Sequence, residues 1–150
     1  MDHPGMVGQR PLPALEPHTA PYWRAARERR LILQQCTRCQ CVQFPPEINC
    51  THCGASETAW IEASGRARLY TWTLCHPPLL PYFAERAPWA VAAVELEEGV
   101  RMATQLVGIE PEQYVVDMPL VVDFEPIDDE RAFVMFRPAA APGVSPTEEE

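Results

Sequence analysis

The residues CTRCQCVQFPPEINCTHCG, positions 36–54, contain two Cys-x-x-Cys pairs separated by ten residues. Each pair places two thiols on one tight turn, and two facing turns supply the four sulfur ligands that Zn²⁺ takes in tetrahedral structural sites. The pattern therefore predicts one zinc ion bound by Cys36, Cys39, Cys50 and Cys53. Four thiolates fill all four coordination positions, so this site is predicted to be structural and closed to substrate.

Two other interpretations of the four cysteines stay open. The same four thiolates could hold iron in a rubredoxin-like site. They could also form two disulfides, but that requires an oxidising compartment. The first twenty residues contain prolines and charges without the apolar run of an export signal. We therefore expect a cytoplasmic location, in which the thiols stay reduced.

Three further side chains are candidates for chemistry. Cys41 could compete for the metal or be a packed thiol, and His52 could bind the metal or point to solvent. Cys75 precedes His76 and could act as a nucleophile, but no third partner is visible beside them. We therefore predict no catalytic residue in this chain.

The sequence after residue 63 has the pattern of an all-β domain. Five runs are rich in β-branched and aromatic residues, and polar turns at residues 97–99 and 128–130 separate some of them. Residues 109–118 have room for one helical turn between the third and fourth runs. Five strands predict an OB-fold barrel. The five runs are Arg66–His76, Trp89–Leu96, Val100–Val107, Leu120–Glu125 and Ala132–Phe136.

Before the cysteines, residues 19–30 suggest a short Arg-rich helix with Thr19 as its cap, and residues 31–35 a brief strand. The predicted fold class is mainly β, with an N-terminal helix, a rubredoxin-like zinc ribbon and a five-stranded OB-fold barrel. The predicted segments are an arm and helix (1–30), the zinc ribbon (31–62), the OB fold (63–138) and an acidic tail (139–150).

Composition excludes several classes of function. None of the twelve basic residues is lysine, so Schiff-base chemistry, pyridoxal phosphate attachment and a Walker-type phosphate loop lack their required side chain. The net charge is −9, and residues 54–150 carry seventeen acids against six arginines, which disfavours nucleic-acid binding. The apolar stretch at residues 69–84 contains three prolines and is shorter than a membrane span, so no membrane association is expected.

The order of these motifs resembles the zinc-ribbon and OB-fold proteins, long known as a domain of unknown function, that accompany thiolases and thiolase-like aldolases. The resemblance covers residues 17–138. One difference is Gln40-Cys41 after the second ligand, where the family usually has glycine. The matching motifs are Cys36-Thr-Arg-Cys39, Phe44-Pro45-Pro46, Cys50-Thr-His-Cys53-Gly54, Ser64-Gly65-Arg66, Tyr70-Thr71-Trp72-Thr73 and Phe136-Arg137-Pro138.

The resemblance implies an accessory subunit in a hetero-oligomer with a thiolase-like catalytic subunit, rather than an enzyme in itself. In such complexes the catalytic chain carries out thiolysis, aldol cleavage or acyl transfer, while the ribbon and OB protein supports assembly. Contact with CoA or an acyl-CoA is implied as a further option, and no cofactor-binding residue is assigned.

Several interpretations of the surface stay open. The arginines of the first half could meet an acidic partner or the phosphates of CoA, or simply lie in solvent. Tyr82, Phe83 and Trp89 could form an interface at the rim of the barrel or pack on the barrel itself. The arginines of the first half that this concerns are Arg24, Arg27, Arg29, Arg30 and Arg38.

Two rival functions also stay open. One is a single-strand nucleic-acid binder, and the other is a stand-alone acyl-CoA enzyme that uses Cys75, His76 and either Glu95 or Glu125.

Overall fold

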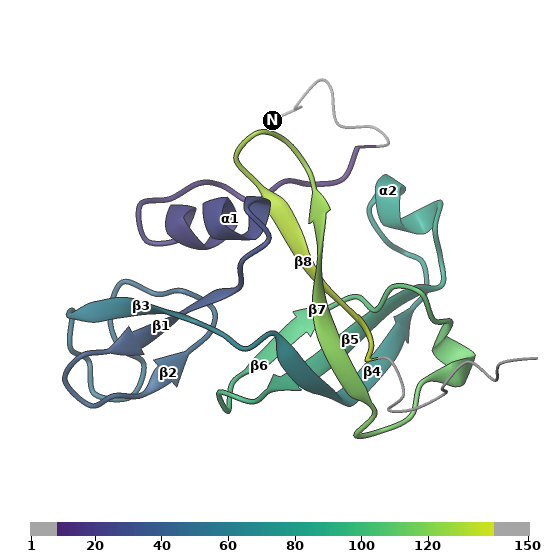
Figure 1. The fold of residues 1–150 in the computed structure, drawn as a ribbon. Helices are drawn as coiled ribbons and strands as arrows, with labels where there is room; N and C mark the ends of the chain where they lie inside the picture. Colours follow the sequence, from purple (N-terminus) through teal and green to yellow (C-terminus); the bar gives the residue numbers. More distant parts are fainter. Residues whose placement is uncertain (1–8, 140–150) are drawn as a thin grey trace, which may run out of the picture.

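The computed structural model describes residues 9–139 of the chain, as a small ribbon beside a curled sheet (Figure 1). The predicted acidic tail, apart from Ala139, and the first eight residues of the predicted arm lie outside the described residues. Within them, no helix is long and apolar enough to cross a membrane. The elements are α1 (Ala20–Arg27), β1 (Ile32–Cys36), β2 (Val42–Gln43), β3 (Thr58–Glu62), β4 (Arg66–Cys75), α2 (Pro81–Ala84), β5 (Trp89–Leu96), β6 (Arg101–Thr104), the 3-10 turn η1 (Pro111–Gln113), β7 (Pro119–Pro126) and β8 (Ala132–Pro138).

The ribbon is a three-stranded antiparallel sheet with the order β2-β1-β3. Strand β1 lies in the middle and pairs with β3 along its whole length, from Ile32 opposite Glu62 to Cys36 opposite Thr58. The chain between β1 and β3 holds both Cys-x-x-Cys turns, so the sheet fixes the base from which the two turns extend.

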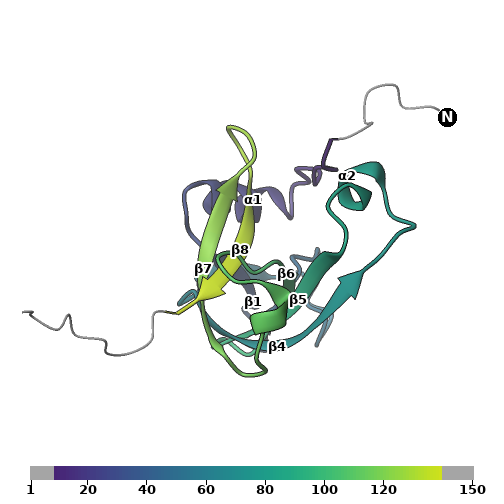
Figure 2. The ribbon, with the colours of Figure 1, turned by 90° about the vertical axis from the view of Figure 1, so that its right-hand side faces the viewer.

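The second sheet has five strands in the order β6-β5-β4-β7-β8 and curls into a half-barrel. Figure 2 shows the curl end on, with β7 and β8 at one side and β4 and β5 at the other. A parallel bridge between Leu106 and Phe136 joins the chain after β6 to β8. Two backbone bonds support this bridge, because Val107 donates to Phe136 and Phe136 donates to Gln105. The predicted mainly β, OB-type architecture is confirmed.

A single hydrophobic core joins the helix, the ribbon and the half-barrel. Tyr22 and Ala26 of α1 and Leu33 of β1 belong to the same buried cluster as Leu69 and Phe136 of the five-stranded sheet. Leu33, Leu69 and Phe136 have no exposed surface, and burial of that kind is the main stabilising contribution in a chain of this size. The division between a ribbon and an OB fold at residues 62 and 63 remains a prediction, because the two share this core.

Two details of the helix differ from the prediction. The helix ends at Arg27 rather than Arg30, because the chain turns into the left-handed region at Arg29, where φ is 62°. Thr19 occupies the position before the helix, but its hydroxyl makes no bond to the first helical turn. It instead accepts from the Glu16 N–H and donates to backbone oxygens at Glu16 and Ala14, which closes the preceding turn.

Several strand predictions need correction at their ends: β1 is Ile32–Cys36, β7 is Pro119–Pro126 and β8 runs on to Pro138. The predicted third run, 100–107, is a strand only from Arg101 to Thr104, because the following residues leave β5 to bridge β8. The predicted run 66–76 ends at Cys75. The helical turn expected within 109–118 is present at Pro111–Gln113. Helix α2, a single turn at Pro81–Ala84, was not expected from the sequence.

Candidate metal centre

The two Cys-x-x-Cys turns have the same backbone geometry. In the first turn the Gln40 N–H donates to the Cys36 carbonyl, and in the second the Gly54 N–H donates to the Cys50 carbonyl, each at 2.9 Å. Both donors have positive φ, 63° at Gln40 and 77° at Gly54. The turn expected to suffer from the missing glycine therefore keeps the same shape. Glutamine at a left-handed position costs roughly 1 kcal/mol relative to glycine.

The equivalence of the two turns also explains Cys41. The Cys36 N–H donates to the Cys41 carbonyl, as the Cys50 N–H donates to the Ala55 carbonyl. Cys41 therefore occupies the place that Ala55 has in the second turn, and it contributes its backbone carbonyl and N–H to the site rather than its thiol.

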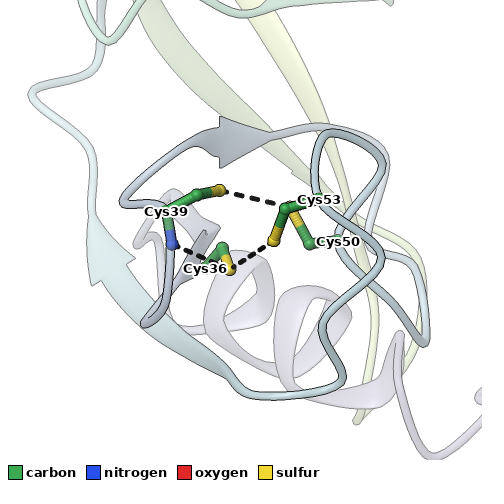
Figure 3. A group of neighbouring side chains, drawn as sticks. All are labelled: Cys36, Cys39, Cys50 and Cys53. Carbon is green, nitrogen blue, oxygen red and sulfur yellow. Dashed lines mark hydrogen bonds between the residues drawn. The ribbon is translucent and has the colours of Figure 1, made fainter.

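The four predicted ligands converge in one cluster. All four sulfur atoms lie within 4.8 Å of one another, with 3.6 Å between Cys36 and Cys53 and 3.6 Å between Cys39 and Cys50. Figure 3 shows the side chains of the two turns pointing toward one another. A tetrahedral ion with Zn–S bonds of about 2.3 Å needs sulfurs about 3.8 Å apart, whereas a disulfide needs about 2.05 Å. All six cysteines are free thiols, and the sulfur geometry fits a four-coordinate metal ion.

The electrostatics of the cluster also fit a cation. Hydrogen bonds from the Cys53 and His52 amides lower the pKa of Cys50 to about 6. The Cys41 amide favours the Cys39 thiolate, but burial and the neighbouring thiols together raise the pKa of Cys39 to about 12. Without a cation, the close sulfurs share protons unequally, because four negative charges at this spacing repel one another. A divalent ion removes that obstacle, so the residues present fit zinc.

Two buried glutamines hold the second turn against the sheet, and the sequence analysis missed them. The Gln43 side chain donates to the Gln34 side-chain oxygen at 2.9 Å, and both amides are buried. The Gln34 oxygen also accepts from the Glu47 N–H at 2.8 Å, and the Gln43 oxygen accepts from the Thr51 N–H at 2.9 Å. These bonds fix the backbone on both sides of Cys50. Their only sequence signal is a pair of polar residues at buried strand positions.

The other candidate side chains lie outside the cluster. Among the described residues, only the four cysteines form a group that could hold a metal ion. His52 is exposed, and its backbone N–H rather than its ring meets the Cys50 sulfur, at 3.4 Å.

The trio considered for a stand-alone enzyme does not assemble with Glu95 as its carboxylate. Cys75 lies opposite Trp89 at one end of the β4–β5 pair, while Glu95 lies opposite Arg68 near the other end. The separation along the strand is roughly 20 Å. Glu95 binds Arg101 at 3.0 Å, and Glu125 lies 3.4 Å from Arg10. The structure thus separates Cys75 from Glu95, and each of the two carboxylates already pairs with an arginine.

The helix arginines bind groups within the chain. Arg24 binds Glu130 at 3.0 Å and Arg29 binds Asp123 at 3.1 Å, so both join the helix to the β7–β8 hairpin. Arg30 binds Glu62 of β3 at 3.2 Å. Arg27 donates to the Asp128 carbonyl at 2.6 Å. These side chains position α1, and the chain itself supplies their partners.

The three aromatic residues at the rim, Tyr82, Phe83 and Trp89, pack on one another. Phe83 and Trp89 have ring centroids 4.9 Å apart, and Tyr82 lies 5.2 Å from Phe83 and 6.1 Å from Trp89. All three are partly buried. Behind Phe83 and Trp89 lies a cavity of about 290 Å³, whose wall also includes Arg10 and Phe133. The Arg10 guanidinium stacks 3.5 Å from the centre of the Phe133 ring.

Comparison with known proteins gives consistent results over the ribbon and the half-barrel. Residues 23–59 match the ChsH2 rubredoxin-like zinc ribbon domain, and residues 60–125 match the ChsH2 C-terminal OB-fold domain. A DUF35 domain-containing scaffold protein of Methanocaldococcus jannaschii is 34% identical over 111 residues, which cover 72% of this chain and 77% of that protein. The chain belongs to the DUF35 family. The resemblance noted from the motifs is therefore confirmed.

Two further DUF35 relatives are informative. The probable enoyl-CoA hydratase alpha subunit of Thermomonospora curvata is 40% identical over 130 residues, or 87% of this chain. This chain spans only 40% of the length of that relative. A solved structure described as the Ltp2-ChsH2(DUF35) aldolase is 39% identical, with a TM-score of 0.74 over 86% of this chain and 100% of that chain.

Proposed function

We propose that this protein is a non-catalytic scaffold subunit that joins a thiolase-like catalytic subunit in a complex acting on acyl-CoA substrates. The observation that carries the proposal is the likeness to one whole chain of the Ltp2-ChsH2(DUF35) aldolase, at 39% identity. Relatives described as scaffold proteins and as a hydratase alpha subunit support the same role. In the described residues, Cys75 lies far from Glu95, and Glu95 and Glu125 each pair with an arginine, so the reacting groups are assigned to the partner.

The zinc centre has a structural part in this proposal. Cys36, Cys39, Cys50 and Cys53 would hold the ion and fill its coordination sphere, which leaves no position for an activated water. When bound, zinc supplies folding free energy to the ribbon rather than Lewis-acid chemistry. Gln34 and Gln43 then keep the second turn in register with the sheet.

The acyl-CoA substrate class is inferred from relatives such as the probable enoyl-CoA hydratase alpha subunit. The catalytic partner would decide whether the reaction is thiolysis, aldol cleavage or acyl transfer. Arg24, Arg29 and Arg30 already bind carboxylates in the chain, whereas Arg38 and Arg68 are exposed and form no ion pair among the described residues. We assign the main CoA contacts to the catalytic subunit, because the reacting groups are assigned to it.

The test is reconstitution with a thiolase-like subunit of the same organism. The isolated chain should show no acyl-CoA turnover, and co-expression should give a stable hetero-oligomer by size-exclusion chromatography and native mass spectrometry. Turnover in the complex should persist in a Cys75→Ser variant, since Cys75 has no assigned role in chemistry. Turnover by the isolated wild-type chain that Cys75→Ser abolishes would instead support the stand-alone enzyme.

A further inference from the structure

One edge of the five-stranded sheet is open along half of its longest strand. β4 pairs with β7 only from Arg66 to Arg68, and with β5 as far as Cys75. A register shift between Leu69 and Thr71 marks a bulge, and a bulge bends the strand that carries it. Beyond the Leu69 amide and carbonyl, no backbone bond joins the outer edge of β4 to any described segment. Figure 2 shows the second half of β4 running away from β7.

We call residues 70–75 the open edge, and its composition is unusual for an unpaired strand. The residues Tyr70 to Cys75 read YTWTLC, without a charge, a proline or a glycine. Natural edge strands are usually blunted by charges, prolines or a covering segment, because an unpaired row of N–H and C=O groups pairs readily with another chain. The open edge has only the bulge at its start, so it is suited to accept a strand.

Exposed apolar side chains lie beside the open edge. Tyr70 and Leu74 are 45% and 38% exposed, and Val115 and Val116 are 62% and 57% exposed. The Asp117 N–H donates to the Leu69 carbonyl at 2.8 Å, which places Val115 and Val116 next to the start of the edge. The Arg101 guanidinium stacks 3.7 Å from the centre of the Tyr70 ring, so part of that ring is already covered within the chain. We call the remaining exposed apolar side chains, Leu74, Val115 and Val116, the apolar margin of the edge.

Arg68 supplies a charge at the same end. It is exposed, and in the described part of the chain it forms no ion pair. Its cross-strand neighbour Glu95 is already bound by Arg101. A carboxylate on an incoming strand would find a free guanidinium there, with the geometry for a bidentate bond.

We propose that the open edge binds an extended segment of the catalytic subunit, which pairs with β4 as an added strand. This inference rests on the proposed function and names the contact within it. Six residues of strand span about 20 Å, which is the length of an average strand. The segment would be uncharged over this length, with β-branched or aromatic side chains toward the apolar margin and one acid that reaches Arg68. Main-chain bonds would give the affinity, and the side chains the specificity.

A second copy of this chain is a poorer occupant of the open edge. Each chain carries a net charge of −9, so two copies repel one another over the distances at which they would approach. The exposed guanidinium of Arg68 also calls for a carboxylate, and the open edge of a second copy has none.

The proposal is tested by hydrogen exchange and by substitution at the open edge. In the complex, backbone amides of residues 70–75 should exchange at least tenfold more slowly than in the free chain. Thr73→Lys adds a charge at an exposed position of the edge and should weaken binding of the catalytic subunit at least tenfold. The matched control is Ala59→Lys, at an exposed position of β3, the edge strand of the ribbon, and it should change binding less than twofold.

Folding and the rival outcomes are separated in the same experiment. Thr73→Lys and Ala59→Lys should both keep the metal content and melting temperature of the wild type. Weaker binding of the catalytic subunit by Thr73→Lys then results from the change at the open edge and not from misfolding. If a complex forms while residues 70–75 exchange as before and Thr73→Lys binds normally, the edge proposal is wrong and the proposed function stands. If the amides of residues 70–75 exchange more slowly as the concentration of the free chain is raised, the edge binds a second copy of this chain instead. If the wild type forms no complex at all, the proposed function itself fails.

Discussion

Gln40 and Gly54 occupy equivalent left-handed positions in two turns that otherwise match. Only one of the two turns has the residue that this backbone conformation favours. Exchanging glutamine and glycine between the two turns therefore measures how much the left-handed conformation of a non-glycine residue lowers the free energy of unfolding.

We predict that Gln40→Gly raises the free energy of unfolding by about 0.5–1 kcal/mol, since glycine adopts positive φ without a steric penalty and the change loses only an exposed side-chain bond to the Thr37 carbonyl. The reverse change in the second turn, Gly54→Gln, should lower it by a similar amount. A Cβ at Gly54 would meet nothing within 4 Å, so this loss reports the backbone conformation alone. Urea unfolding of the zinc-loaded variants measures both, and equal stability of Gln40→Gly and the wild type would contradict the prediction.

For the metal ligands, we predict that Cys36→Ser reduces bound zinc from one per chain to below one tenth. Cys36 is fully buried, and its sulfur lies 3.6 Å from that of Cys53, so the serine oxygen leaves an incomplete site in the interior. Plasma emission analysis of the purified variant measures the zinc. Cys75→Ser is the control, and retention of zinc by Cys36→Ser would show that the site lies elsewhere. Iron in place of zinc in the wild type would support the rubredoxin-like alternative.

Much of this centre could be predicted from the spacing of Cys36, Cys39, Cys50 and Cys53, because the turn geometry of such pairs is local. The roles of Gln34 and Gln43 could not, since their bonds cross the sheet and depend on the register of β1 and β2. The prediction for Thr19 failed for a similar reason. The Thr19 hydroxyl could bond either to the first turn of the helix or to the turn before it. It bonds to the N–H and carbonyl of Glu16, in the turn before the helix.

At the scale of elements, the β7–β8 hairpin is the support of helix α1. Trp23 packs edge to face on Phe133, with ring centroids 6.3 Å apart. Asp128, in the hairpin turn, binds Arg131, and Arg131 also donates to the Pro13 carbonyl at 2.6 Å. The Asp128 carbonyl accepts from Arg27. The turn therefore joins the segment before α1 and the helix itself to the sheet.

This turn should give the protein a measurable pH dependence. Arg131 and the Glu130 N–H lower the pKa of Asp128 below its ordinary value. A carboxylate with a lowered folded pKa contributes stability above the unfolded pKa of about 3.9, and that contribution is lost as the pH falls through the folded value. We predict that Asp128→Asn lowers the melting temperature by about 2 to 4 °C at pH 7. The difference from the wild type should shrink below about pH 4.

The control for this prediction is Asp129→Asn, an exposed neighbour whose side chain makes no hydrogen bond or ion pair in the described residues. It should melt like the wild type at both pH values. Loss of zinc in acid affects all three proteins alike, so the comparison uses differences between variants. If the melting temperatures of Asp128→Asn and the wild type differ by the same amount from pH 7 to pH 2.5, Asp128 stabilises the turn by something other than its charge.

The elements themselves were largely predictable, and their ends were not. Alternation and turn residues marked all five barrel strands. The end of β6 at Thr104 depends on a distant partner, because the next residues leave β5 for the bridge at Phe136. The open edge of β4 was equally invisible, since it results from a bulge at Tyr70 and from the short length over which β7 pairs with β4.

At the scale of the whole molecule, the shared core ties the metal centre to the barrel. Leu31 and Leu33 precede the first ligand by only a few residues, and both are buried with side chains of the five-stranded sheet. Loss of order in the ribbon would therefore remove part of the wall of the barrel core.

We predict that removal of zinc destabilises the whole chain in one cooperative transition. Zinc contributes on the order of 10 kcal/mol to comparable ribbons, so the melting temperature should fall by at least 10 °C when a strong chelator is added. Differential scanning calorimetry, together with hydrogen exchange of the amides in the barrel strands, follows the change. Two separate transitions, with the barrel transition unmoved, would show that the ribbon and the barrel fold independently.

The bridge between Leu106 and Phe136 has a consequence for the order of events during translation. The ribbon is complete once residue 62 has left the ribosome, so it can take up its metal while the barrel is still being made. The half-barrel must wait for β8, its last strand, which also carries the packing surface for Trp23. A nascent chain stopped before residue 132 therefore holds all four cysteines but lacks the strand on which the helix and the ribbon core pack. Chaperone capture of nascent chains should select chains stalled between residues 104 and 132.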